Sequence, residues 1–311
     1  MEKIKEVFVY SPARQRRYLT HLKMHGISSP CKIPLYNRTR WNSWFRMVFY
    51  AKDHIIYWPA FFKEEAENDK RHNNLEAINF CLQNERELSV ITIYLNFISI
   101  YAKEFVQDLD FFQQSKKPIF PFVESRLQQL TSYIEANRNA NNFGPLLEDL
   151  IKDLKFDPEE FYLIFQEAFG VAYEKFKLHI PNHPARSLFY ASQVFDPKFI
   201  HIRDITRKDI RRYNIIKEFD NPSDGLLQEW GIYCGLDNEI INEIELDQYW
   251  LSKETQLPIL YKIAFDYIWL PVSSCSVERS FSMYNSLLDS DRQNLSLDSL
   301  KRLNMLYFNG F

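Results

Sequence analysis

Glycine and proline are both scarce in this chain, with seven glycines and fourteen prolines among 311 residues. Turn-rich β-sandwiches and barrels, collagen-like repeats and low-complexity segments all need more of these two residues. Strand patterns are also hard to find. The scarcity argues against those classes and predicts a helical fold.

Cysteine is rare as well. The four cysteines lie far apart and form no CxxC pair: Cys31, Cys81, Cys234 and Cys275. Neither a structural zinc site nor a disulfide framework fits such spacing. We expect reduced, buried thiols and no bound metal.

Long hydrophobic runs are missing too. The longest, residues 90–102, is too short to span a bilayer and contains Asn96. The N-terminus lacks the apolar run and small-residue cleavage site of a secretory signal. These features predict a buried helix at 90–102, an intracellular protein and no membrane partner.

Aromatic residues, by contrast, are abundant: 26 Phe, 18 Tyr and 6 Trp. Such side chains carry much of the buried area of a core, and they can also stack on nucleic-acid bases. The aromatic core is the favoured interpretation, and a stacking surface is the alternative.

Charge is unevenly placed along the chain. The net charge is −3, yet residues 1–50 carry ten Lys or Arg against two acids, a local balance of +8. Arg14, Arg16 and Arg17 are therefore candidates for contact with DNA phosphates, which salt would weaken strongly. The alternative is a solvated helix face that binds nothing.

Periodicity predicts a series of helices. The first is opened by Pro12 and closed by Gly26, and the next begins near Thr39 and is ended by Pro59. Helical spacing continues over 74–84, 86–114, 119–137, 145–154, 159–178, 185–194, 224–234, 238–250 and 255–269. The segment 187–200 could be helical or extended, and we predict a helix.

The last 60 residues carry the most specific pattern. A helix is expected after the N-cap candidates Ser273 and Ser274, and a final helix after Ser296. Taken alone, Glu278 could be only a cap-region acid and Arg279 a surface base. The apolar positions repeat at helical steps in both helices: Val277, Phe281, Tyr284 and Leu288, then Leu297, Leu300, Leu303 and Tyr307.

The whole string LPVSSCSVERSFSMYNSLLDSDRQNLSLDSLKRLNMLYFNG resembles the C-terminal dimerisation region of hAT transposases, proteins of transposable elements. Upstream, Trp250, Pro258, Leu260 and Ala264 fit the same pattern. A weaker agreement is Phe195-Asp196-Pro197-Lys198-Phe199. Near the other end, Thr39-Arg40-Trp41-Asn42-Ser43 is similar to the motif that opens the family's helical insertion domain. The residues that match in the C-terminal string are Pro271, Ser273, Ser274, Glu278, Arg279, Phe281, Ser282, Arg292, Leu295 and Leu303.

This resemblance implies an all-α architecture in two parts. Residues 1–245 would be a multi-helical insertion domain, and residues 246–311 would be the dimerisation region, with C-terminal helices of an incomplete ribonuclease-H-like core. The implied partner is a second copy or another hAT transposase chain. Apolar residues of the last helices would form the dimerisation contact: Phe281, Leu288, Leu300, Leu303 and Tyr307.

The family cuts and rejoins DNA with two aspartates and a glutamate that hold divalent ions. Glu278 matches the glutamate, whereas the aspartates would precede the insertion domain and have no counterpart here. One carboxylate is a poor Mg²⁺ site, so we predict no cofactor and no enzyme activity for the chain alone. The resemblance also makes Trp41 a base-stacking residue and Arg40 its phosphate-side neighbour, although Trp41 could equally be a core aromatic.

Two functions therefore remain open. One is a truncated or domesticated transposase whose activity is protein dimerisation, located in the nucleus by resemblance. The other is the C-terminal fragment of an active, DNA-binding hAT transposase that works with a catalytic core supplied elsewhere. A decayed element without a selected role is a third possibility.

Overall fold

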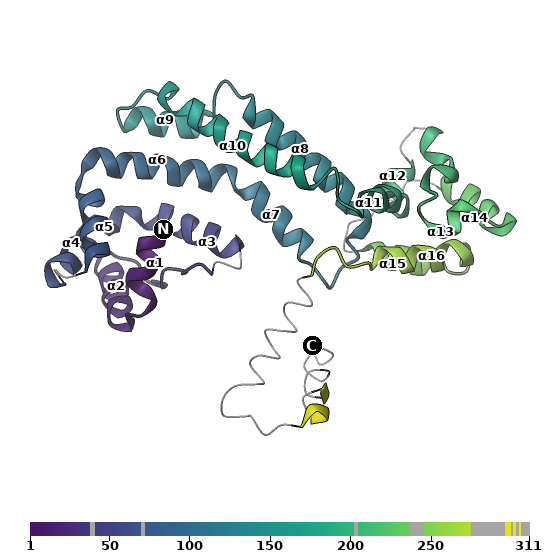
Figure 1. The fold of residues 1–311 in the computed structure, drawn as a ribbon, viewed down its shortest axis with the longest axis horizontal. Helices are drawn as coiled ribbons and strands as arrows, with labels where there is room; N and C mark the ends of the chain where they lie inside the picture. Colours follow the sequence, from purple (N-terminus) through teal and green to yellow (C-terminus); the bar gives the residue numbers. More distant parts are fainter. Residues whose placement is uncertain are drawn as a thin grey trace. The chain divides into compact units, whose positions relative to one another are not determined.

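The computed structural model describes residues 1–37, 41–69, 72–201, 205–236, 245–274, 296–299, 301–302 and 305. Over these ranges the chain forms sixteen α-helices and five short 3-10 helices, and no strand (Figure 1). The predicted all-α class is confirmed for this part of the chain. A ribonuclease-H-like core stays a prediction.

Two compact units make up the chain. Unit 1 comprises Met1–Leu109 and Ser132–Glu174, and unit 2 comprises Asp110–Thr131 and Lys175–Phe311. This division differs from the predicted boundary at residue 245, which follows the family pattern and stays a prediction. Three helices run across the division: α7 (Lys103–Phe112), α8 (Val123–Arg138) and α10 (Glu159–His179).

Unit 1 holds most of the N-terminal helices. They are α1 (Glu2–Val9), α2 (Pro12–Met24), α3 (Trp41–His54), η1 (Ile55–Tyr57), α4 (Trp58–Asn68), α5 (Asn73–Gln83), α6 (Glu85–Tyr101) and α9 (Pro145–Asp153). The start and end of α2 follow local chemistry. Ser11 Oγ accepts the Arg14 N–H, Pro12 occupies the first turn, and Gly26 follows the helix at φ +85°.

Pro59 does not end a helix, contrary to the prediction. The helix α3 ends at His54, a 3-10 turn follows, and Pro59 lies in the first turn of α4. Proline is tolerated there because the first N–H groups of a helix have no partner within the helix. The helix α1 was also not predicted.

Aromatic side chains fill the core of unit 1. Tyr18 packs edge-on against Phe61, with ring centroids 5.0 Å apart, and its hydroxyl accepts the Trp58 indole N–H at 3.0 Å. A second group surrounds Phe97 of α6, which stacks on Phe165 of α10 at 3.9 Å. The predicted aromatic core is confirmed, and so is the helix at 90–102, which lies within α6 apart from Ala102, its C-cap residue.

Unit 2 contains a chain of shorter helices. They are η2 (Phe120–Phe122), α11 (Arg186–Ser192), η3 (Gln193–Phe195), α12 (Pro197–His201), η4 (Ile205–Lys208), η5 (Ile210–Tyr213), α13 (Lys217–Asp220), α14 (Asp224–Cys234), α15 (Leu246–Ser252) and α16 (Pro258–Ile268). The ambiguous segment 187–200 is helical in the main, as predicted, but it is divided into α11, η3 and α12, with Asp196 extended before Pro197. Two buried aromatic side chains donate to backbone carbonyls here: the Tyr233 hydroxyl donates to Val194, and the Trp230 indole donates to Lys208.

The cysteines differ from the expectation in one case. Cys234 is buried and burial raises its thiol pKa to about 11, as a structural thiol should. Cys31, however, is exposed, since it lies on the extended segment between α2 and α3. Cys81 is half-buried, and Cys275 lies outside the described residues.

Among the described residues, no single helix has both the length and the apolar composition to cross a membrane. Only α6 and α7 taken together meet that test, and they are bent by 44° at their junction.

Candidate functional site

The residues that the family pattern places upstream of the C-terminal string come together in unit 2. Trp250 lies on α15, and Leu260 and Ala264 lie on α16; all three are completely buried. Pro258 starts α16 in the first turn, where proline fits best. Trp250, Leu260 and Ala264 therefore belong to the hydrophobic core of unit 2.

A buried carboxylate from another helix caps α16. Glu229 of α14 accepts the backbone N–H groups of Ile259 and Leu260, at 2.9 and 2.7 Å. A helix start presents N–H groups without internal partners and a partial positive charge, so an acid is stabilised there. Glu229 thereby ties α14 to the helix that leads into the C-terminal string.

Replacing Glu229 by alanine is expected to lower the free energy of unfolding by about 2 kcal/mol, because one buried and one part-buried N–H group lose a charged acceptor. Urea denaturation followed by circular dichroism measures this. Glu254, an exposed acid that follows α15, provides the matched control. Equal denaturation midpoints for Glu229→Ala and Glu254→Ala would show that the Glu229 cap does not contribute to the free energy of unfolding.

All five residues predicted for dimerisation fall on the C-terminal segment beyond residue 274. Phe281, Leu288, Leu300, Leu303 and Tyr307 lie outside the described residues, and so does Glu278. Ser296 is described: its Oγ accepts the Ser299 N–H at 3.2 Å, as the predicted N-cap requires. Exposed large apolar side chains do occur between 246 and 311: Leu251, Ile259, Trp269, Leu297 and Met305.

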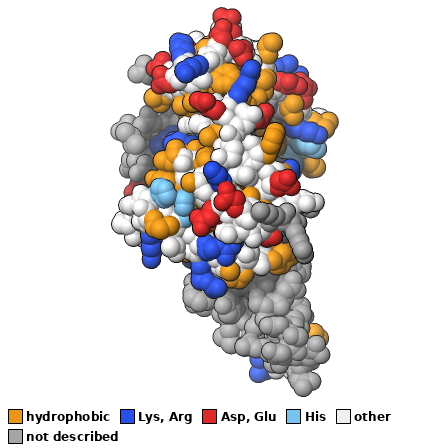
Figure 2. Space-filling model, turned by 90° about the vertical axis from the view of Figure 1, so that its left-hand side faces the viewer, with side chains coloured by type: hydrophobic (Ala, Val, Ile, Leu, Met, Phe, Trp, Pro, Cys, Tyr) orange, Lys and Arg blue, Asp and Glu red, His pale blue; other side chains and the backbone are white. Residues whose placement is uncertain are grey.

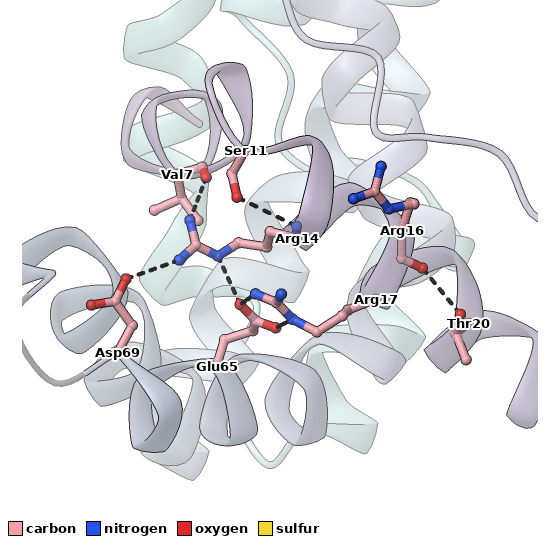
Figure 3. A network of polar contacts seen from close by, with 8 residues as sticks. All are labelled: Val7, Ser11, Arg14, Arg16, Arg17, Thr20, Glu65 and Asp69. Carbon is pink, nitrogen blue, oxygen red and sulfur yellow. Dashed lines mark hydrogen bonds and ion pairs between the residues drawn. The ribbon is translucent and has the colours of Figure 1, made fainter.

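The basic N-terminal segment is partly neutralised by α4. Arg14 is only 6% exposed, and its guanidinium donates to Glu65, to Asp69 and to the Val7 carbonyl (Figure 3). All three of its nitrogens are thus engaged within the fold. Arg14 fixes α2 against α1 and α4, and its burial leaves it poorly placed to reach a phosphate.

Arg17 and Arg16 are placed differently from Arg14. Arg17 also binds Glu65, through Nε and Nη2, while its side chain stays 49% exposed. Arg16 points away from this network and is exposed (Figure 3). Of these three arginines, Arg16 is the one whose side chain lies exposed outside the ion-pair network.

The acid at the centre of the network has a shifted pKa. Burial alone would raise the pKa of Glu65, but hydrogen bonds from Arg17 and Arg14 outweigh it and lower the pKa below its ordinary value. The carboxyl is therefore ionised at neutral pH. Sequence reasoning missed Glu65 because it lies 51 residues from Arg14 along the chain.

The face drawn in Figure 2 shows blue and red side chains interspersed with hydrophobic ones. The net charge of +8 over residues 1–50 is thus a property of the sequence segment, and acids from α4 join it in the fold. These acids neutralise part of the positive charge of the segment, and the predicted contact with DNA phosphates stays a prediction.

The Arg40-Trp41 pair is described only in part. Trp41 is the first residue of α3, whereas Arg40 and the Trp41 side chain lie outside what the structure describes. Ser43 holds the segment before the helix, donating to the Asn37 carbonyl and accepting the Asn37 N–H. The start of α3 is therefore tethered, and the stacking role of Trp41 stays a prediction.

Within the described ranges, no group of three or more His, Cys, Asp or Glu side chains is arranged to hold a metal ion. The predicted family acid is outside those ranges, so the expectation for Mg²⁺ is untested.

Comparison with known proteins identifies one region. Residues 234–309 match the family model described as the hAT family C-terminal dimerisation region. The match starts at the last residue of α14 and includes α15, α16 and the C-terminal string up to Asn309. No curated protein matches the chain.

Proposed function

We propose that this chain, which carries the hAT-family C-terminal dimerisation region, is a transposase-derived protein that self-associates through residues 234–309. The observation that carries the proposal is the family match over these residues. The partner is a second copy or another hAT-family chain. Because the interface comes from the same segment on each copy, a symmetric pair is the simplest product.

Apolar surface in this region supports the proposal. Leu297 and Met305 are 64% and 65% exposed, and Trp269 is 40% exposed. Large apolar side chains left in water mark surfaces that another chain can cover. The sequence adds Phe281, Leu288, Leu300, Leu303 and Tyr307 at helical spacing, which would widen this surface.

The test is the mass of the purified chain, measured by light scattering over a range of protein concentration. We expect a dimer or larger species. Phe281→Asp and Leu303→Asp should each raise the dissociation constant of self-association by about 30-fold or more, as loss of an interface hot spot does. Ile56, a 73% exposed apolar residue of unit 1, gives the control Ile56→Asp. A monomeric wild type, or equal masses in all variants, contradicts the proposal.

We further propose that the chain alone neither cuts nor joins DNA. The resemblance implies three carboxylates that hold two metal ions, and Glu278 is the one counterpart among the 311 residues. A single carboxylate is a poor site for Mg²⁺, which usually needs several oxygen ligands and substrate phosphates besides. Mg²⁺-dependent nicking by the pure protein that disappears in Glu278→Gln would disprove this.

The alternative function is DNA binding by a fragment of an active hAT transposase in the nucleus. Exposed Arg16 and the Arg40-Trp41 pair support it, since arginine suits phosphate geometry and an indole can stack on any base. Light scattering with a hairpin DNA at two salt concentrations separates the two functions. A monomer that shifts onto DNA only at low salt favours the alternative, and an oligomer that ignores DNA favours self-association.

A further inference from the structure

The solvent side of α10 carries large apolar residues that nothing in unit 1 covers. Leu163 is 75% exposed, Val171 57% and Ile164 44%. The opposite side of the helix is the buried one, where Phe161, Phe165 and Phe169 meet the rings of α6. Leu163, Ile164 and Val171 therefore do not contribute to the packing of α10 in unit 1.

Acidic residues lie between these apolar positions. Glu160, Ile164, Glu167 and Val171 follow one another at steps of four, three and four, which places them along one side of the helix. Leu163 lies next to them on the same side. We call these five residues the α10 surface.

The surroundings of the α10 surface are acidic as well. Residues 145–174, which form α9 and the unit 1 part of α10, contain eight acids and two bases. The exposed acids Asp149 and Asp153 belong to α9, which the Tyr162 hydroxyl ties to α10 through Glu148 at 2.9 Å. The field around the exposed leucine, isoleucine and valine is thus strongly negative.

We propose that the α10 surface binds a basic amphipathic helix of a partner protein. The apolar residues of such a helix would cover Leu163, Ile164 and Val171, and its lysines or arginines would pair with Glu160 and Glu167. This is the helix-in-groove type of recognition, with charge complementarity selecting the partner. The surface lies outside residues 234–309, so it is distinct from the dimerisation region.

The charge pattern excludes two other occupants. A nucleic-acid strand would bring phosphates against Glu160 and Glu167, and the net charge over residues 145–174 would repel it. The same surface of a second copy would place glutamates against glutamates, which costs binding energy. A basic helix avoids both conflicts.

The test uses the full chain and a fluorescent Leu–Lys peptide of about five helical turns, with leucines at amphipathic spacing. Its binding is measured by anisotropy. We expect Leu163→Ser with Val171→Ser to weaken binding by about tenfold or more, because two buried apolar contacts are lost. Glu160→Gln with Glu167→Gln should weaken binding and reduce its dependence on salt.

Two controls decide the result. A Leu–Glu peptide with the same spacing should not bind, and the matched variant Ile56→Ser with Glu67→Gln, which changes an exposed apolar residue and an exposed acid elsewhere in unit 1, should bind as the wild type does. The proposal is overturned if the wild type fails to bind the Leu–Lys peptide. It is equally overturned if the Leu–Glu peptide binds as well, or if the control variant loses as much affinity as the α10 variants.

Discussion

Glu65→Ala is expected to lower the free energy of unfolding of unit 1 by about 3–5 kcal/mol, the usual result of removing one partner of a buried ion pair. The variant leaves the Arg14 guanidinium buried without its main acid, and its remaining partners are the Val7 carbonyl and the 46% exposed Asp69. Arg17 loses the same partner but can turn towards water, since half of its side chain is already exposed. Most of the loss therefore comes from Arg14.

Urea denaturation followed by circular dichroism measures this change. Glu67, an exposed acid on the same helix, provides the control, and Glu67→Ala should change stability by no more than about 0.5 kcal/mol. If the two variants share one denaturation midpoint, the network around Arg14 does not stabilise the fold.

The contribution of Glu65 also depends on pH. Its pKa in the folded protein is below the ordinary value, so the stabilisation is present above the unfolded-state pKa and is lost as pH falls through the folded-state pKa. The stability difference between the wild type and Glu65→Gln should therefore shrink in acid. A difference that stays constant down to strongly acidic pH would assign the effect to packing instead of charge.

Trp250→Ala is expected to cost about 3–5 kcal/mol and to disorganise the base of the dimerisation region. The indole is completely buried, donates to the Phe195 carbonyl at 2.9 Å, and lies 5.2 Å from the Tyr233 ring. Alanine removes this volume from the centre of unit 2 and leaves the carbonyl without its donor. Because α15 belongs to the matched region, self-association should weaken together with stability.

A comparison among tryptophans separates burial from residue type. Trp269, at 40% exposure, should tolerate alanine with a small loss of stability. Trp250→Phe keeps an aromatic ring but removes the N–H, so it should cost about 1–3 kcal/mol for the unpaired carbonyl. The denaturation midpoint should be highest for Trp269→Ala, lower for Trp250→Phe and lowest for Trp250→Ala. Any reversal of this order would show that burial and the indole hydrogen bond do not set the cost.

Local signals in the sequence were sufficient for most helices. The α2 helix follows from Ser11, Pro12 and Gly26, because capping and a left-handed glycine act within a few residues of the chain. The family of the C-terminal region was also readable, since its motif residues are contiguous and the match over residues 234–309 agrees with them. The prediction that Pro59 ends a helix was wrong, because proline is compatible with both the end and the first turn of a helix.

What the sequence alone determined is the helical class, the aromatic composition of the core and the family of the C-terminal region, because periodicity, composition and a contiguous motif are all local properties. Only the tertiary structure decided which arginine side chains are held in buried ion pairs and which are exposed to solvent. Arg14 and Arg16 are two residues apart, yet one is buried against Glu65 and the other is exposed. The partners Glu65 and Glu229 reach their targets across 51 and 30 residues, and only packing brings such distant side chains together.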